Sequence, residues 1–301
     1  MTSSKSVAVI GLGSMGYGVA LSCLRAGHRV WGADVMPEPV QRLQAEGGEQ
    51  GTLTSAAPDL DAVAVVVLNA AQTLEVLFGE AGVVPMMRAG SVVIGCSTVA
   101  PDVAREVETR CADHGVHFLD APLSGGAAKA AEGKLTLMAS GTSEAFAAAA
   151  PVLDAAAEKV FELGDAAGAG SAMKAVNQLL AGVHIAAMAE ALTFGMTQGV
   201  APKTFVDVIS RCAGTSWMLE NRAPHIVDGD YTPLSQINIW PKDLGIVLDI
   251  AKSVGFAAPI TEAALQQYRE AVAMGLGRED DAAVAKVYAR NAGVTLPGER
   301  E

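Results

Sequence analysis

The feature that most constrains the fold is a glycine-rich turn near the start of the chain. Four apolar residues, Val7–Ile10, run directly into Gly11-Leu12-Gly13-Ser14-Met15-Gly16, and a helical pattern follows over Tyr17–Arg25. In such a turn the first glycine allows the tight bend, the second lets a pyrophosphate approach the backbone, and the third lets the helix pack on the strand. Free N–H groups at the helix start then face the phosphates. The order strand, turn, helix predicts a dinucleotide site with residues 11–16 as cofactor contacts.

The residue that ends the next predicted strand indicates which dinucleotide is bound. Asp34 follows the strand His28–Ala33 and lies eighteen residues beyond Gly16. A carboxylate at about this spacing binds the ribose hydroxyls of NAD and repels the extra phosphate of NADP. No arginine follows directly, since the next residues are Val35-Met36-Pro37. We therefore expect NAD, and the spacing disfavours the alternative of a simple turn with a capping aspartate.

Length and charge limit the classes of protein to which the chain can belong. Its 301 residues exceed the usual single domain, so two domains are expected. The composition, 50% hydrophobic and 18% charged, is that of an ordered globular protein. A formal charge of −12 disfavours nucleic acid or an anionic membrane as a partner, because both require a basic surface. A small anionic substrate remains open where a few cations are placed locally.

The chain has the features of a cytoplasmic protein. No apolar signal segment precedes the first strand, and the longest apolar run, Ala62–Leu68, is too short to span a bilayer. The four cysteines have no Cys-x-x-Cys spacing, so reduced thiols are expected. His114 and His117 are interpreted as turn residues, and no metal site is expected.

Apolar runs alternate with helical patterns through the first half of the chain. Unbroken runs of Val, Ile, Ala and Leu indicate strands buried on both faces, as in a parallel doubly wound sheet. The predicted strands are Val7–Ile10, Val30–Ala33, Ala62–Leu68, Val92–Gly95 and His117–Leu119, with Leu135–Ala139 and Lys159–Leu163 expected to extend the same sheet.

The strand pattern ends near Gly168, and helical periodicity follows. The predicted helices are Ser171–Gln198, Pro202–Arg211, Leu244–Val254, Pro259–Ala273 and Asp281–Arg290. We therefore expect an α/β protein with a Rossmann-type NAD-binding domain over 1–165. An all-helical domain over 166–301 is expected to serve substrate binding and dimerisation.

Three later segments, together with the glycine turn, resemble the β-hydroxyacid dehydrogenase family. They are Asp120–Gly126 (Asp-Ala-Pro-Leu-Ser-Gly-Gly), Gly168–Gln178 (Gly-Ala-Gly-Ser-Ala-Met-Lys-Ala-Val-Asn-Gln) and Lys242–Gly245 (Lys-Asp-Leu-Gly). The four motifs occur in the family's order and at its approximate spacing, and the resemblance covers essentially the whole chain. It implies a homodimer or homotetramer that oxidises a hydroxy acid by passing a hydride to NAD.

The same resemblance assigns roles to individual residues. Ser124, Gly125 and Gly126 would hold the acid group of the substrate. Lys174 would be the general acid/base, and Asn177 would hold the substrate or orient the lysine. No metal is then needed, because the lysine moves the proton and NAD takes the hydride.

These assignments agree with the physical chemistry of the residues. Most helical lysines are solvated, but Lys174 lies one turn into an apolar helix, after a Gly-x-Gly loop at the predicted domain junction. A lysine withdrawn from water there exchanges its proton more readily. Asn177, three residues on, lies on nearly the same face. Ser124–Gly126 links a strand to a helical stretch, so its N–H groups and hydroxyl suit a carboxylate, although an ordinary turn has the same pattern.

Further cofactor contacts follow the later strands. By resemblance, Thr98 contacts the cofactor after the strand Val92–Gly95, and Lys242 reaches the cleft near cofactor and substrate. Leu68 and Asn69 end an earlier strand and are expected to lie along the dinucleotide. For Lys242 a surface position is the alternative, and its neighbour Asp243 is interpreted as a helix-start residue that complements the dipole.

The C-terminal half indicates a substrate class. The segments Ser216–Arg222, Asp228–Leu234 and Gly277–Asp281 resemble the L-threonate dehydrogenase subgroup, which oxidises C2 of a four-carbon sugar acid to a 2-oxo acid. Asn221, Arg222 and His225 are candidate hydrogen-bond partners for its hydroxyls, with a loop or subunit interface equally open. The rival activities are those of a tartronate semialdehyde reductase and a 3-hydroxyisobutyrate dehydrogenase. An imine reductase or a non-catalytic NAD-binding module is disfavoured by the presence of Lys174.

Overall fold

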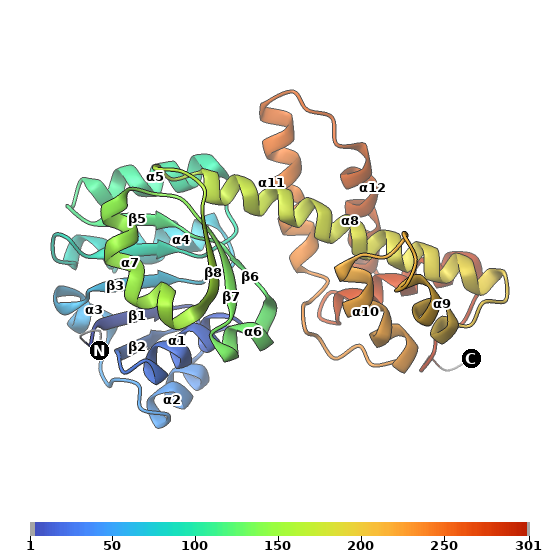
Figure 1. The fold of residues 1–301 in the computed structure, drawn as a ribbon, viewed down its shortest axis with the longest axis horizontal. Helices are drawn as coiled ribbons and strands as arrows, with labels where there is room; N and C mark the ends of the chain where they lie inside the picture. The colour runs from blue at the N-terminus through green and yellow to red at the C-terminus, as the bar shows by residue number, and fades with distance from the viewer. Residues whose placement is uncertain (1–3, 300–301) are drawn as a thin grey trace. The chain divides into compact units, whose positions relative to one another are not determined.

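The structure is a computed structural model that describes residues 4–299. The chain divides into two compact units, Met1–Lys174 and Ala175–Glu301. The first unit is α/β and the second is helical (Figure 1). This is the predicted fold class, with the division nine residues later than expected, inside a helix rather than before it.

A five-stranded parallel sheet forms the centre of the first unit. Its strands are β1 (Ser6–Ile10), β2 (Arg29–Ala33), β3 (Ala62–Val65), β4 (Val92–Gly95) and β5 (His117–Asp120), in the order β2-β1-β3-β4-β5. Val7 pairs with Val30 on one side and with Ala62 on the other. The strand order reverses between β1 and β3, where doubly wound sheets bind ligands at the carboxyl ends of their strands.

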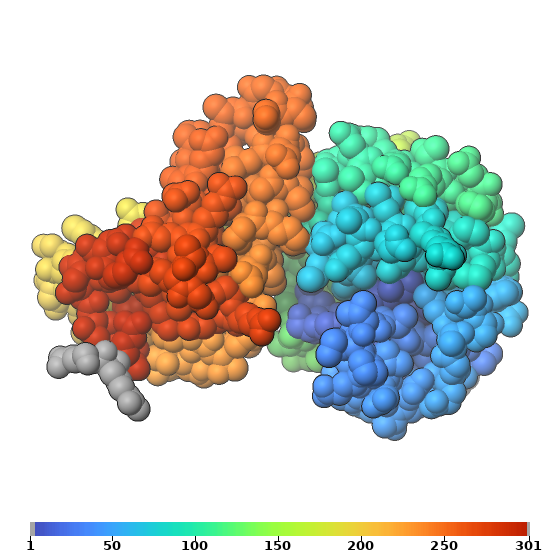
Figure 2. All heavy atoms as spheres, turned by 180° about the vertical axis from the view of Figure 1, so that it is seen from behind, coloured from blue at the N-terminus to red at the C-terminus, as the bar shows by residue number. Residues whose placement is uncertain are grey.

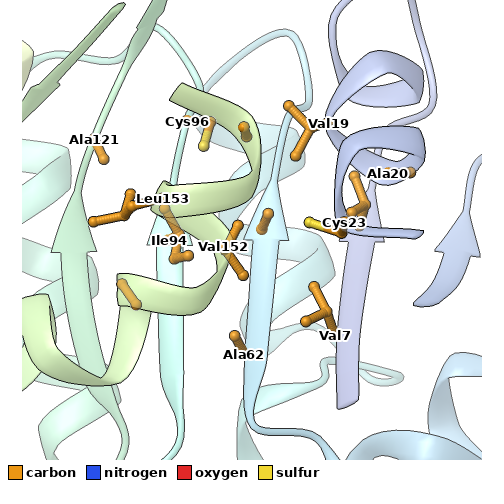
Figure 3. Packing of buried hydrophobic residues seen from close by; sticks show 14 of the residues in the cluster. Val7, Val19, Ala20, Cys23, Ala62, Ile94, Cys96, Ala121, Val152 and Leu153 are labelled. Carbon is orange, nitrogen blue, oxygen red and sulfur yellow. The ribbon is translucent and has the colours of Figure 1, made fainter. Parts of the chain in front are cut away.

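Both faces of this sheet are covered, which explains why its strands are apolar throughout. The helices of this unit are α1 (Gly16–Arg25), α2 (Pro37–Ala45), α3 (Leu53–Ala56), α4 (Ala70–Phe78), α5 (Pro101–Ala112), α6 (Gly126–Glu132) and α7 (Ser143–Ala156). Side chains from α1 and α7 pack on Val7, Ala62 and Ile94 of one face (Figure 3). The alternate residues Ala8 and Val63 face the other way, toward α4 and α5.

Contrary to our expectation, the last predicted strands do not extend the main sheet. β7 (Leu135–Ala139) and β8 (Ala157–Glu162) form a separate three-stranded sheet with β6 (Leu123–Ser124). Asp120, at the end of β5, shares only an isolated antiparallel bridge with Ser140. Pro122 follows almost at once, and proline has no N–H with which to continue a strand ladder. The chain therefore turns away and pairs β6 with β7 instead.

The longest helix, α8 (Ala169–Thr197), contains the division between the two units. It has 29 residues and contains an 18-residue stretch with a mean hydropathy of 1.5, so by length and composition it could cross a membrane. Ile185, Met188 and Leu192 on this helix are buried in the core of the second unit. The core helix of a globular unit meets the same two criteria, so length and hydropathy alone do not identify a membrane span.

The second unit packs its helices around α8. They are α9 (Pro202–Ile209), α10 (Trp217–Asp228), α11 (Ile239–Ser253), α12 (Pro259–Ala273) and α13 (Ala285–Ala292), with a 3-10 turn at Asp281–Val284. Trp240 stacks on Tyr268 with ring centroids 5.6 Å apart, which joins α11 to α12. The turn between these two helices projects from the unit (orange in Figures 1 and 2).

Two helices of this unit differ from the sequence prediction. α10 was not predicted, because Pro224 interrupts its apolar pattern. It is nevertheless bounded by a capping serine, Ser216, which accepts a hydrogen bond from the N–H of Leu219 at 3.1 Å, and by Gly229 in the left-handed region. α11 begins at Ile239, five residues before the predicted start.

Candidate active site

The glycine turn between β1 and α1 combines two closely packed positions with one open position. Gly11 has φ of +91°, and a Cβ there would lie 2.6 Å from the carbonyl oxygen of Val66. A Cβ on Gly16 would lie 1.8 Å from the carbonyl oxygen of Gly11. A Cβ on Gly13 would meet nothing within 4 Å. The fold therefore requires Gly11 and Gly16, while the space beside Gly13 is left for a ligand.

The groups around this turn fit NAD. Among the described residues no side chain caps the start of α1, so its first N–H groups can face a pyrophosphate. Asp34 follows β2 and is half-buried, and its Oδ2 accepts the N–H of Leu12 at 2.7 Å. Its Oδ1 accepts the N–H of Met36 at 2.9 Å. Each carboxylate oxygen keeps a further lone pair for a ribose hydroxyl.

The other predicted cofactor contacts follow neighbouring strands of the same sheet. Leu68 and Asn69 lie between β3 and α4, and Thr98 lies between β4 and α5. The side chain of Leu68 is 62% exposed, and Asn69 Oδ1 caps α4 by accepting the N–H of Gln72 at 2.9 Å. Because parallel strands end at one edge, these residues share an edge with the glycine turn and Asp34.

The predicted carboxylate site lies where β6 passes into α6. Gly125 and Gly126 have φ of +131° and +73°, in the region that disfavours other residues. A Cβ on Gly126 would meet nothing within 4 Å, and within the described chain no side chain caps α6. Ser124 is half-buried. The segment is thus open beside Gly126, and the partly accessible Ser124 lies two residues before it.

Lys174 lies next to this segment. Lys174 is only 8% exposed, and its Nζ donates a hydrogen bond to the carbonyl oxygen of Leu123 at 2.8 Å. Leu123 directly precedes Ser124, so the amine and the proposed carboxylate site are neighbours. The burial of Lys174 agrees with the sequence prediction.

Sequence reasoning gave no separate role to Asp120, which holds the start of α8. This carboxylate is 1% exposed and accepts hydrogen bonds from the N–H groups of Gly168 and Ser171 at 2.9 and 2.8 Å. Burial raises the pKa of Asp120, although the hydrogen bonds from Ser171 and Gly168 oppose the shift. Its position three residues before Leu123, within the Asp-Ala-Pro-Leu-Ser-Gly-Gly motif, was the only available pointer in the sequence.

In the second unit, Asn177 and Lys242 belong to one hydrogen-bonded chain. Asn177 Nδ2 donates to Gln178 Oε1 at 2.9 Å, and Gln178 Nε2 donates to Asp243 Oδ2 at 2.5 Å. Lys242 Nζ pairs with Asp243 Oδ1 at 2.5 Å. Asp243 is therefore a buried bridge between α8 and α11, and its interpretation as a helix-start residue was wrong, because α11 begins four residues earlier.

The candidate substrate contacts on α10 lie against other side chains of the second unit. Arg222 is buried and its Nε donates to Asp281 Oδ1 at 2.5 Å, while Trp240 Nε1 donates to Asp281 Oδ2 at 3.0 Å. Asn221 accepts a hydrogen bond from Arg222, and His225 Nδ1 lies 3.0 Å from Asp280 Oδ1. These contacts fit a structural role for α10 better than direct substrate recognition.

Models of two protein families match nearly the whole chain. Residues 6–164 match the NAD binding domain of 6-phosphogluconate dehydrogenase. Residues 168–288 match the family described as NAD-binding of NADP-dependent 3-hydroxyisobutyrate dehydrogenase.

Individual proteins are similar over their full length. The chain is 49% identical to an L-threonate dehydrogenase of Cupriavidus necator, over 99% of this chain and 100% of that protein. It is 47% identical to an L-threonate dehydrogenase of Escherichia coli K12, over 97% and 96%. A crystal structure of a 3-hydroxyisobutyrate dehydrogenase from Salmonella typhimurium superposes with a TM-score of 0.88 at 47% identity, covering 94% of this chain and 99% of that one.

Proposed function

Because the chain belongs to the β-hydroxyacid dehydrogenase family and is an NAD-dependent dehydrogenase acting on a CH–OH group, we propose that its substrate is L-threonate. We further propose that Lys174 is the general base and that the product is the 2-oxo acid. The names of the L-threonate dehydrogenases at 49% and 47% identity support this substrate, whereas the Salmonella typhimurium structure at 47% identity is named for 3-hydroxyisobutyrate, which the test below therefore includes.

The observation that carries the mechanism is the hydrogen bond from Lys174 Nζ to the carbonyl oxygen of Leu123. It holds the amine beside Ser124, Gly125 and Gly126, the proposed carboxylate site. The hydroxyl that is oxidised in a 2-hydroxy acid lies on the carbon next to the carboxylate. A base adjoining the carboxylate site is therefore suited to that hydroxyl.

The proposed reaction divides the work between the protein and NAD. Bound NAD supplies the acceptor for the hydride that leaves C2. Ser124 Oγ and the N–H groups of Gly125 and Gly126 bind the carboxylate and fix the orientation of C2. Lys174, neutral beforehand, removes the proton of the hydroxyl as the carbonyl forms, and Asn177, one helical turn on, orients the lysine or the substrate.

The direct test is turnover of L-threonate by the purified protein, followed by the absorbance of NADH. D-erythronate, D-glycerate and 3-hydroxyisobutyrate are compared under the same conditions, each with NAD and with NADP. Lys174→Ala is expected to lower kcat by about 10²- to 10⁴-fold, the usual contribution of a general base. Lys174→Arg keeps a cationic donor for Leu123 but cannot release a proton, so it is expected to be equally impaired.

Lys203→Ala is the matched control, because that lysine lies on α9 with its side chain 75% exposed. It is expected to leave kcat unchanged. Turnover of glycerate or 3-hydroxyisobutyrate alone would retain the mechanism and reject L-threonate as substrate. Full activity in Lys174→Arg would reject the lysine as base.

A further inference from the structure

Asp120 joins the start of α8 to the central sheet. Its Oδ2 accepts the N–H groups of Gly168 and Ser171, and its Oδ1 accepts the hydroxyl of Ser171 at 2.7 Å. The first N–H groups of a helix have no partner within the helix, so a buried helix start needs such an acceptor. Asp120 provides it from the end of β5.

A second contact makes this junction tight. Ser140 Oγ accepts the N–H of Gly170 at 3.0 Å and lies 3.4 Å from Asp120 Oδ2. The backbones of Asp120 and Ser140 exchange two hydrogen bonds, at 3.0 and 2.8 Å. A Cβ on Gly170 would lie 2.4 Å from the carbonyl oxygen of Met138, so the helix rests directly on the strands. The first turn of α8 has little freedom to shift while these contacts hold.

The segment from Asp120 to Gly126 also holds the amine of Lys174. Ser171, clamped by Asp120, lies one helical turn before Lys174, and Nζ is bonded to Leu123, three residues after Asp120. The segment then continues into Ser124, Gly125 and Gly126. The segment from Asp120 to Gly126 therefore fixes the backbone from which Lys174 projects. It also fixes the carbonyl oxygen that accepts the hydrogen bond of the Lys174 amine.

We propose that Asp120 is a positioning residue for Lys174, which it holds at a set place relative to the carboxylate site. The proposal rests on the proposed function of Lys174 as the base. Geometry is the property required of Asp120, because an amide oxygen in place of Oδ2 accepts the same two backbone N–H groups. Asp120→Asn should therefore preserve the clamp, whereas Asp120→Ala should release the first turn of α8.

Two readouts on the full chain test this. The first is kcat and KM for L-threonate with NAD. Asp120→Ala is expected to lower kcat by about 10- to 100-fold, as small misplacements of a catalytic group do, and Asp120→Asn to remain within about threefold of the wild type. The affinity for NAD is expected to stay unchanged in both variants, since the glycine turn and Asp34 are untouched.

The second readout does not depend on turnover. Trace acetic anhydride labels lysine amines, and peptide mass spectrometry gives the rate for Lys174 relative to exposed Lys203. Release of the clamp is expected to raise that ratio in Asp120→Ala and not in Asp120→Asn. Thr142→Ala is the matched control, because Thr142 caps α7 of the same unit by accepting the N–H of Ala145 at 3.2 Å. It should lower the melting temperature and alter neither readout.

The outcomes separate the two proposals. If the wild type does not oxidise L-threonate, the proposed substrate fails, and the labelling ratio alone then decides the role of Asp120. An unchanged ratio in Asp120→Ala, or an Asp120→Asn as impaired as Asp120→Ala, would overturn the positioning role. If Asp120→Ala does not fold, Ser171→Ala takes its place, since it removes the hydroxyl bonded to Oδ1. A ratio and kcat equal to those of Thr142→Ala would then reject the proposal.

Discussion

We propose that the side chain of Asp34 determines the choice between NAD and NADP. Both of its oxygens are bonded to backbone N–H groups, of Leu12 and Met36, so the carboxylate is fixed before any ligand arrives. A fixed anion costs less to order on binding, and its charge disfavours a second phosphate. Replacement of this anion should therefore change affinity and selectivity together.

We expect Asp34→Ser to weaken NAD binding by about 10- to 100-fold, because hydrogen bonds to a charged acceptor contribute about 1.5–3 kcal/mol. The affinity for NADP should fall much less, so the ratio of kcat/KM for NAD to kcat/KM for NADP should fall. The measurement is steady-state kinetics with each cofactor. An unchanged ratio would show that another residue determines the selectivity.

The cysteines allow a second prediction at the scale of single residues. Burial raises the pKa of Cys23, Cys96 and Cys111 to about 12, whereas Cys212 is exposed. At pH 8 the three buried thiols are therefore almost entirely protonated, and the thiolate is the reactive form. A thiol-reactive chromophore should label Cys212 alone in the native protein and all four thiols in denaturant. Rapid labelling of a second cysteine at pH 8 would contradict the described core.

Single residues also mark what the sequence could not predict. The burial of Lys174 could be predicted from the apolar residues around it, whereas its role as the base was implied by the family resemblance and stays a proposal. The sequence could not show that Arg222, a candidate substrate contact, pairs with Asp281, because Asp281 lies 59 residues away. Asp243 was assigned to a helix start for the same reason, since its partner Gln178 lies on another helix. Pairings between distant segments are set by packing, which local patterns do not record.

At the scale of elements, the turn between β1 and α1 separates a structural glycine from a ligand-facing one. The carbonyl of Gly11 occupies the space that a side chain at position 16 would need, while position 13 is open. Gly13→Ala should therefore retain the wild-type melting temperature and lose NAD affinity, because the methyl group enters the space proposed for the pyrophosphate. Gly16→Ala should lower the melting temperature itself. Calorimetric titration with NAD and thermal denaturation of both variants test this, and equal effects on stability would contradict it.

The elements themselves were predicted with uneven success. The five strands of the main sheet were identified because burial on both faces leaves a continuous apolar run. The separate sheet of β6, β7 and β8 was missed, since β6 has only two residues and its pairing depends on the turn at Pro122. α10 was missed because Pro224 conceals a helix that its caps define.

At the scale of the whole molecule, each unit has its own hydrophobic core. Val7, Ile94 and Leu153 belong to one core of the first unit, and Ile185, Trp240 and Tyr268 belong to the core of the second. The predicted architecture, a Rossmann-type domain followed by a helical one, follows from the change of period near Gly168. Asp120 binds the first turn of α8 to the sheet unit, a contact that no periodicity could indicate. Assembly into a dimer or tetramer stays a prediction.

Separate cores imply that the two units can be destabilised separately. Asp281 is fully buried, and its two oxygens accept hydrogen bonds from Arg222 and Trp240. Asp281→Asn leaves the buried guanidinium of Arg222 without its counter-charge, at a cost of about 3–5 kcal/mol. We expect scanning calorimetry to show one transition whose midpoint is lowered by about 10–20 °C, as a loss of this size implies for a unit of this length, and a second one unchanged. If NAD binds at the glycine turn as proposed, saturating NAD should raise the midpoint of the second transition only, since it stabilises that unit by about 2.7 kcal/mol at 100 times the dissociation constant. A single transition that both the substitution and NAD displace would mean that the units unfold together, coupled through the continuous helix α8.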